Sequence, residues 1–564
     1  MPEPSLDTSP LDTSDGPAGQ TASVAEAAPM SAVLDSAHIG DIEGALGKIS
    51  LGDIGERHTI KQRLLTLLAI VGPGLIVMVG DNDAGGVATY SQAGQNYGYS
   101  LLWVLLLLIP VLVVNQEMVV RLGAVTGVGH ARLINERFGR GWGWFSVGDL
   151  FLLNFLTIVT EFIGVSLAAD YFGVSKYLVV PAAAVALIAI MATGSFRRWE
   201  RALFAFIAIS VLQVPLVLLA HPHWGSAARH FVIPSVQGGI SSDSVLLLIA
   251  IVGTTVAPWQ LFFQQSNIID KRITPRFISY ERVDTVLGSI VVVTGAASLM
   301  IAATWAATST GTVGKFTDAG NIAHLLATHS HYLGGIFAIV LLDASIIGAA
   351  AVTLSTSYAF GDVFNMRHSL HRSVKDAKSF YATYTAMITA AALITLIPGA
   401  PLGLITTAVQ ALAGLLLPSA SVFLLLLCND KEVLGPWVNA RWLNLLAGFI
   451  VAVLLLLSGI LMATTLFPHI NVITTAEQIA VAMVAAGLLA SGALKMSQRR
   501  HPREATLERH YTRTEKLKWQ MPQLALLQPV TWSAGTKLGM LALRGYLVVG
   551  AALLAVKAVQ LGGG

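Results

Sequence analysis

The sequence has 564 residues, of which 54% are hydrophobic and only 12% are charged, and its mean hydropathy is +0.68. Ordinary soluble domains carry about 25% charged residues, so this composition excludes a soluble globular protein and predicts an all-α polytopic membrane protein. The net charge of +3 indicates no nucleic-acid partner, because the basic residues lie in short loops between apolar segments. The single cysteine, Cys428, excludes internal disulfides and thiolate metal clusters.

The first 58 residues are rich in Ser, Asp, Ala, Gly and Pro and contain no sustained apolar run. This composition predicts a disordered tail over residues 1–58. The tail lacks the basic start and the apolar core of a secretory signal.

The first apolar segment, 64–97, is interrupted near its middle. About sixteen mostly apolar residues precede the sequence Gly80-Asp81-Asn82-Asp83, which is followed by Ala84-Gly85-Gly86. At about 1.5 Å per residue, the break lies inside a hydrocarbon core of about 30 Å. Carboxylates on unwound backbone at that depth are tolerated only where they line a buried or water-filled cavity, so they predict a site for a cation. The alternative is an extracellular loop in which the glycines are ordinary turn residues.

Hydropathy predicts eleven further spans after this segment and a thirteenth candidate. Arg544 and Lys557 interrupt the candidate, and an interfacial helix would also tolerate these charges. The eleven are 101–123, 145–169, 177–194, 202–220, 244–269, 283–308, 333–361, 379–398, 403–428, 442–466 and 474–495, and the candidate is 538–560.

The distribution of basic residues predicts the topology. If the amino-terminal tail is cytoplasmic, the loops on that side hold seventeen Lys and Arg residues, whereas the opposite loops hold only Lys176, Arg229 and Lys315. This asymmetry follows the positive-inside rule and supports a multi-pass protein of the cell membrane with a cytoplasmic amino terminus.

A second interruption lies in the sixth span, at Gly253-Thr254-Thr255-Val256-Ala257-Pro258. Pro258 removes a helical hydrogen bond and clashes with the carbonyl of Thr254, which frees main-chain oxygens as ligands. A simple proline kink in a structural helix is the alternative.

The two breaks are five spans apart, so they occupy matching positions in two halves of opposite orientation. Paired interrupted segments of this kind indicate a transporter with its site near the membrane midplane. We therefore predict a 5+5 inverted-repeat core over 61–428, two additional helices over 429–496, and a basic tail over 497–564.

Several stretches resemble the natural resistance-associated macrophage protein (NRAMP) family of divalent-metal transporters over about 63–470. They are VGPGLIVMVGDNDAGGVAT, YGYSLLWVLLL, TVAPWQLFFQQS and VQALAGLLLPSASVFLLLLCNDKEVLGPWVN. The resemblance implies the inverted-repeat fold of the neurotransmitter-sodium symporters and a metal bound at both breaks.

The chain departs from the family pattern at several of the implied ligands. Asp83 keeps the family's aspartate, but Gly86 stands in place of the ligand Asn, and Ala257 in place of the ligand Met. Thr254 holds the position whose carbonyl binds the metal, and Gln410 matches a glutamine that approaches the ion. Further differences are that Ala84 replaces a usual Pro, Trp259 replaces a His, and Asp81 and Asn82 are additional polar residues.

These replacements favour a hard cation. Loss of the thioether removes the preference for soft ions, and the smaller side chains leave room for the water that Mg²⁺ retains. The pattern resembles the NRAMP-related magnesium transporter branch. It predicts a site built from Asp83, Asp81, Asn82, Gly80, Thr254, Ala257, Gln410 and Gly86 that carries Mg²⁺ as its main ion and Mn²⁺ as a further one, by alternating access.

Tight proton coupling is not expected. Glu161 matches the family's third-helix Glu, but Ile158 stands where an Asp is usual, and Trp259 and Gln264 stand where histidines are usual. A proton-coupled Mn²⁺/Fe²⁺ symporter and an ion-sensing membrane receptor or scaffold are the alternatives. The expected partners are a divalent metal ion and the lipid bilayer, with no cofactor, no nucleic acid and no enzymatic activity; the sequence indicates no oligomeric state.

Overall fold

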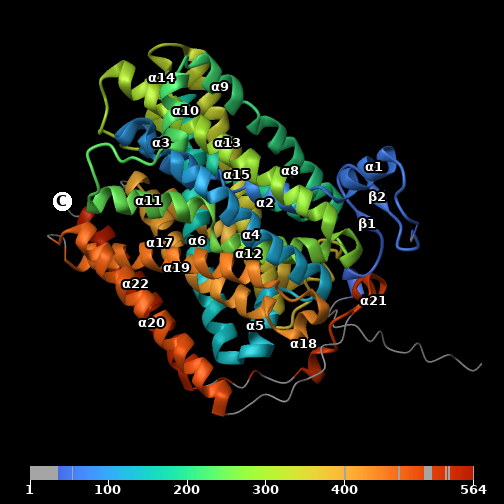
Figure 1. The fold of residues 1–564 in the computed structure, drawn as a ribbon. Helices are drawn as coiled ribbons and strands as arrows, with labels where there is room; N and C mark the ends of the chain where they lie inside the picture. Colours follow the sequence, from blue (N-terminus) through green and yellow to red (C-terminus); the bar gives the residue numbers. More distant parts are fainter. Residues whose placement is uncertain are drawn as a thin grey trace, which may run out of the picture.

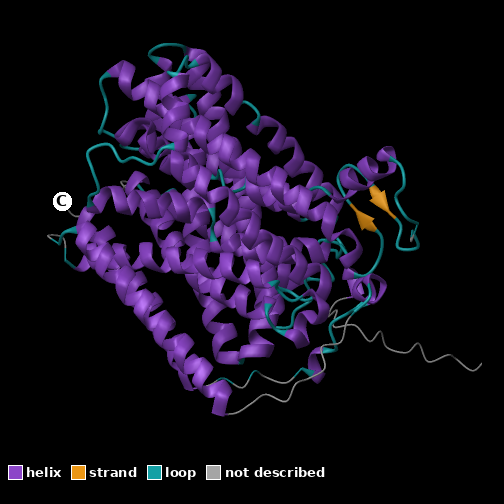
Figure 2. Cartoon of the chain, viewed as in Figure 1, coloured by secondary structure: helices purple, strands orange, loops and turns teal. Residues whose placement is uncertain are grey.

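The structure, a computed structural model, describes residues 36–53, 55–398, 402–467, 470–500, 511–527, 530, 532 and 534–562. These residues form a bundle of helices with one small two-stranded sheet at its edge (Figure 2). Each predicted span coincides with a helix or with a broken helix. By length and apolar character, nine helical runs in the described part can cross a membrane, or ten if α1 and α2 form one bent span.

In the described structure, the first five spans are built from eight helices. Their helices are α1 (Ile60–Ile70), α2 (Pro73–Val79), α3 (Ala84–Tyr97), α4 (Leu102–Thr126), α6 (Arg140–Tyr171), α7 (Lys176–Met191), α8 (Phe196–Ser210) and α9 (Gln213–Leu219).

The next five spans begin with a second broken helix. They are α11 (Ser242–Thr255) with α12 (Pro258–Asp270), α13 (Ile278–Thr310), α15 (His331–Val363), α16 (Lys378–Thr395) and α17 (Leu402–Cys428). The two sets form the inverted-repeat architecture predicted from the sequence.

The remaining helices connect or flank this core. They are α5 (His130–Phe138), α10 (Trp224–Val232), α14 (Ala319–Ala327), α18 (Lys431–Leu434), α19 (Arg441–Leu466), α20 (Val472–Arg500), α21 (Arg513–Lys518) and α22 (Ala534–Gly562). Figure 1 shows α20 and α22 along one outer edge of the bundle and α1 with β1 and β2 at the opposite edge. The 538–560 segment is therefore helical, and its passage through the membrane stays a prediction.

Three helix pairs make up the centre of the bundle: α6 packs on α15, α3 on α13, and α11 on α17. The α3–α13 contact is especially close at Gly94, where a Cβ atom would overlap the carbonyl of Met300. The Thr304 hydroxyl donates to the Gly94 carbonyl at 3.1 Å. Helix α3 is thereby fixed to α13.

The amino-terminal segment differs from the expectation of disorder over residues 1–58. Residues 1–35 lie outside the described residues, but β1 (Ile42–Glu43) and β2 (Lys48–Ile49) pair antiparallel and bury Ile42 and Ile49. Arg272 and Arg276 donate to main-chain carbonyls of this segment, at Ala37, Asp41, Asp53 and Gly55. Composition missed the segment because its order depends on basic residues more than 200 positions away.

A further break, between α1 and α2, was not predicted. The helices bend by 53° at Val71–Gly72, where Gly72 has φ of +155°. A Cβ atom at Gly72 would overlap the Glu200 carboxylate, and this backbone conformation is strained for any residue with a side chain.

We expect Gly72→Ala to lower the free energy of unfolding by about 1–3 kcal/mol because it combines backbone strain with this overlap. Thermal unfolding of the detergent-solubilised protein measures the change. Gly335→Ala, at a helical position with open space around it, is the control. An unchanged melting temperature for Gly72→Ala would contradict the expectation.

Candidate metal site

The first predicted break lies in the interior of the bundle. Helix α2 ends at Val79 with Gly80 as its cap, and α3 begins at Ala84 with Asp83 as its N-cap. The side chains of Asp81, Asn82 and Asp83 are each at most 4% exposed. This burial excludes an exposed turn between two spans. The helix resumes earlier than expected, since Gly85 and Gly86 are already helical.

Asp83 has a structural role at the start of α3. Its Oδ1 atom accepts the N–H of Gly86 at 2.7 Å, which caps α3. The positive end of the helix dipole favours a carboxylate here. Asp83 and Glu161 of α6 lie next to each other and both face Gly348 of α15, where a Cβ would lie 2.8 Å from Asp83 Cβ and 2.7 Å from Glu161 Oε2.

Among the described residues, the Asp81 carboxylate has no hydrogen-bond partner. Both of its oxygens are buried and without a hydrogen bond among the described residues. Since an isolated buried carboxylate is costly, this group calls for a proton or a cation. Asn82 turns toward α13, where its Nδ2 atom donates to the Val292 carbonyl at 3.2 Å, while its Oδ1 atom has no partner in the described structure.

The second break is shorter than predicted. Gly253, Thr254 and Thr255 are the last residues of α11, and only Val256 and Ala257 separate it from Pro258, the first residue of α12. Pro258 therefore acts at the first position of a new helix, where its missing N–H costs nothing. The Thr254 hydroxyl is buried and, within the described chain, unpartnered.

The two breaks meet at Gly86. A Cβ atom there would lie 2.6 Å from the Asp81 carbonyl oxygen and 3.2 Å from Thr254 Oγ1. On the other side of α3, the side-chain amide of Gln410, from α17, fills the space next to Gly85, and its Nε2 atom has no partner in the described part. The structure thus gathers Asp81, Gly86, Thr254 and Gln410 around the start of α3.

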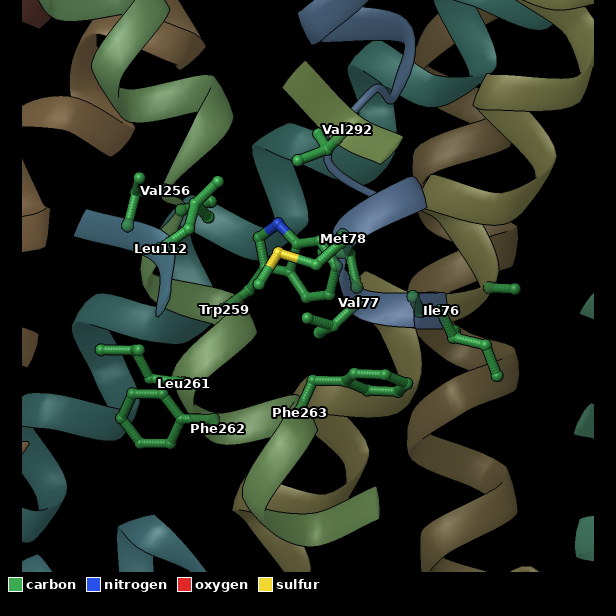
Figure 3. Packing of buried hydrophobic residues seen from close by; sticks show 14 of the residues in the cluster. Ile76, Val77, Met78, Leu112, Val256, Trp259, Leu261, Phe262, Phe263 and Val292 are labelled. Atoms are coloured by element: carbon green, nitrogen blue, oxygen red, sulfur yellow. The ribbon is translucent and has the colours of Figure 1, made fainter. Parts of the chain in front are cut away.

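Two of the predicted residues have other surroundings. A Cβ atom at Gly80 would lie 3.3 Å from the Trp259 ring, so Gly80 packs against an indole. Figure 3 shows Trp259 of α12 in one apolar cluster with Met78 and Val77 of α2. Ala257 is buried as the N-cap of α12, and beyond a methyl group it offers only main-chain atoms.

Polar residues outside the predicted set also hold this region together. The Tyr90 hydroxyl and Thr255 Oγ1 are 2.8 Å apart and join α3 to α11. The Ala84 N–H donates to Glu161 Oε2 at 3.0 Å, which joins the first break to α6. The seven-residue spacing of Asp83 and Tyr90 places them on one helix face. This spacing could have indicated from the sequence that Tyr90 lies on the same side of α3 as Asp83.

The natural resistance-associated macrophage protein-like (Nramp) family model matches residues 74–464, well over half of the 564 residues. The chain belongs to the Nramp family. The match contains both helix breaks and Gln410.

Named relatives of this Nramp chain cover most of its length. The divalent metal cation transporter MntH of Ralstonia nicotianae is 30% identical over 407 residues, which are 69% of this chain and 89% of the relative. The protein of the same name from Burkholderia ambifaria is 27% identical over 403 residues, which are 68% of this chain and 86% of the relative.

A crystal structure of the Eremococcus coleocola manganese transporter has the same fold. It superposes with a TM-score of 0.59 at 20% identity and covers 80% of this Nramp chain and 99% of its own chain. At this identity the likeness concerns the fold alone, and it agrees with the inverted-repeat core described above.

Proposed function

We propose that this Nramp protein transports divalent metal cations across the cell membrane, with Mg²⁺ as its main cargo and Mn²⁺ as a further one. The observation that carries the proposal is the group of buried, unpartnered polar atoms where the two helix breaks meet. They include the hydroxyl of Thr254 and both carboxylate oxygens of Asp81, the residue whose main-chain carbonyl lies beside Gly86 near the start of α3. A divalent cation would compensate these groups. The names of the MntH relatives support metal transport as the general activity.

The preference for Mg²⁺ rests on the ligand chemistry. Carboxylate, amide, hydroxyl and main-chain oxygens suit hard cations, and a thioether is absent at Ala257. In this proposal Asp83 supplies direct charge, while Asp81 and Asn82 hold the ion or its waters. The carbonyls near Gly80 and Thr254 and the amide of Gln410 complete the ligands, and the small residues Gly86 and Ala257 leave room for retained water.

Transport would proceed by alternating access. The broken helices would rock against a scaffold of α6, α7, α15 and α16, which pack on one another. We place the amino terminus in the cytoplasm on the charge asymmetry of the loops. An inside-negative potential would then drive uptake, since a divalent ion gains about 4.6 kcal/mol per 100 mV on entry.

An uptake assay in proteoliposomes tests the proposal. We expect ion flux for Mg²⁺ and Mn²⁺, little flux for the softer ion Cd²⁺, and no acidification of the lumen reported by an enclosed pH dye. Protein-free liposomes provide the background. Binding without flux for every ion would overturn transport, and a clear preference for Cd²⁺ would overturn the hard-cation site.

A proton-coupled Mn²⁺/Fe²⁺ symporter is the second candidate. The names of the relatives mention divalent metal cations and manganese, and the proton path is favoured by the position of Glu161, a buried carboxyl next to Asp83. Mn²⁺ uptake with acidification of the lumen, and without Mg²⁺ uptake, is the result that would select it.

A further inference from the structure

The bend between α1 and α2 is held by an ammonium group at the end of α1. The Nζ atom of Lys271 donates to the carbonyls of Ile70 at 2.7 Å and Val71 at 2.9 Å, the last turn of that helix. The same atom pairs with Glu200 Oε1 of α8 at 2.7 Å, and both side chains are fully buried. The other oxygen of Glu200 accepts the N–H of Ala45 in the amino-terminal segment.

A carboxylate holds the other side of the bend. Asp284 of α13 accepts three main-chain N–H groups at the start of α2: those of Gly72 at 3.1 Å, Gly74 at 2.7 Å and Leu75 at 3.2 Å. Opposite charges therefore cap the two helix ends, each with the sign that the helix dipole favours. The bend is a defined arrangement with its own buried ion network.

Within the described part of the chain, Glu281 is the member of this network without a hydrogen-bond partner. It lies three residues before Asp284, on the same face of α13, and its side chain is 0% exposed. Neither of its oxygens has a hydrogen bond in the described structure. The charged groups that act on it are Asp284, Lys271 and Glu200.

Other charged groups near this end of α13 are engaged elsewhere or exposed. Arg276 donates to the carbonyls of Asp53 and Gly55, and Arg282 pairs with Glu117 of α4 at 2.7 Å. Lys61 and Arg63 of α1 are exposed to the surroundings of the bundle. With Glu281 ionised, the buried network would hold three carboxylates against the single ammonium of Lys271.

We propose that Glu281 is a proton-binding site that sets the position of α1. The bent arrangement holds Glu281 as the neutral acid, because an unpaired carboxylate beside two others is costly in the interior. Loss of the proton adds a negative charge to the network and favours a rearrangement that admits water, in which α1 and the amino-terminal segment leave Lys271 and Glu200. Low pH therefore stabilises the bend, and high pH releases it.

The distance between α1 and α13, measured by pulsed electron spin resonance in nanodiscs, tests this site. Spin labels at Leu64→Cys and Ile290→Cys occupy exposed positions, and the native Cys428 is buried and remains unlabelled. From about pH 5 to about pH 9 we expect a shift from one distance to a second, longer or broader one. Labels at Val185→Cys of α7 and Leu393→Cys of α16 should show no shift.

Two substitutions distinguish a proton site from a structural carboxyl. Glu281→Gln imitates the neutral acid, so we expect it to keep the low-pH distance at every pH, whereas Glu281→Asp should retain the shift. A distance that does not depend on pH in the otherwise native chain would overturn the proposal, and so would an equal shift in Glu281→Gln. The measured distance does not depend on which ion is transported. Failure of the proton-site proposal and failure of the proposed function are therefore distinguishable.

Discussion

Asp83→Asn is expected to reduce Mg²⁺ uptake by about 100-fold. The amide retains an oxygen that can accept the Gly86 N–H, so the cap of α3 survives and only the charge is lost. Removal of one partner from a buried charge pair costs about 2–5 kcal/mol, and 100-fold corresponds to about 2.7 kcal/mol. Initial uptake rates in proteoliposomes at matched protein density measure the effect.

Asp343→Asn is the matched control for this substitution. Asp343 is also a buried aspartate within a span, but its Oδ2 atom accepts the Ser210 hydroxyl at 2.7 Å, and it is not one of the residues gathered at the two breaks. We expect uptake by this variant to stay close to that of the native chain. Native uptake by Asp83→Asn would place the ion elsewhere.

Gly86→Ala is expected to reduce uptake by about tenfold or more. The added methyl would lie 2.6 Å from the Asp81 carbonyl oxygen and 3.2 Å from Thr254 Oγ1. One of the two breaks must then shift. Overpacking of this kind costs about 1–3 kcal/mol, and about 1.4 kcal/mol corresponds to each tenfold loss of uptake. The methyl would also take space that we assign to retained water.

Measuring both uptake and thermal unfolding of Gly86→Ala distinguishes an effect on the ion site from a loss of folding. Gly335→Ala on α15 adds the same methyl in open space and should behave like the native chain in both measurements. We expect Gly86→Ala to remain folded, because α3 keeps its contact with α13. A fully active Gly86→Ala would show that the two breaks separate without consequence for the ion.

The helix breaks were predictable because their signals are local. Gly80, Asp83 and Pro258 are residues that end or begin helices, and an apolar background makes them conspicuous. Their extent was less predictable. Gly85 and Gly86 suggested a longer break, yet both are helical, and their lack of a side chain serves the close approach of Gln410 and Asp81.

The bend at Gly72 and the ordered amino-terminal segment could not be predicted from local sequence. The bend depends on Lys271 and Asp284, which are about 200 positions away in the chain. The orientation of Asn82 toward Val292 likewise depends on which helix packs behind the break. Sequence periodicity reports the apolar character of a span and carries no information about such distant partners.

The close contact between Gly94 of α3 and the Met300 carbonyl of α13 restricts which helices of the transporter can move separately. A slide of either helix would bring residues with a Cβ atom opposite the main chain of its neighbour, so we expect α3 and α13 to move together. Asp83 caps α3 and the Asn82 side chain donates a hydrogen bond to α13, so both residues would move with these two helices. The cation would then keep these two neighbours throughout the cycle while its remaining ligands are exchanged around it.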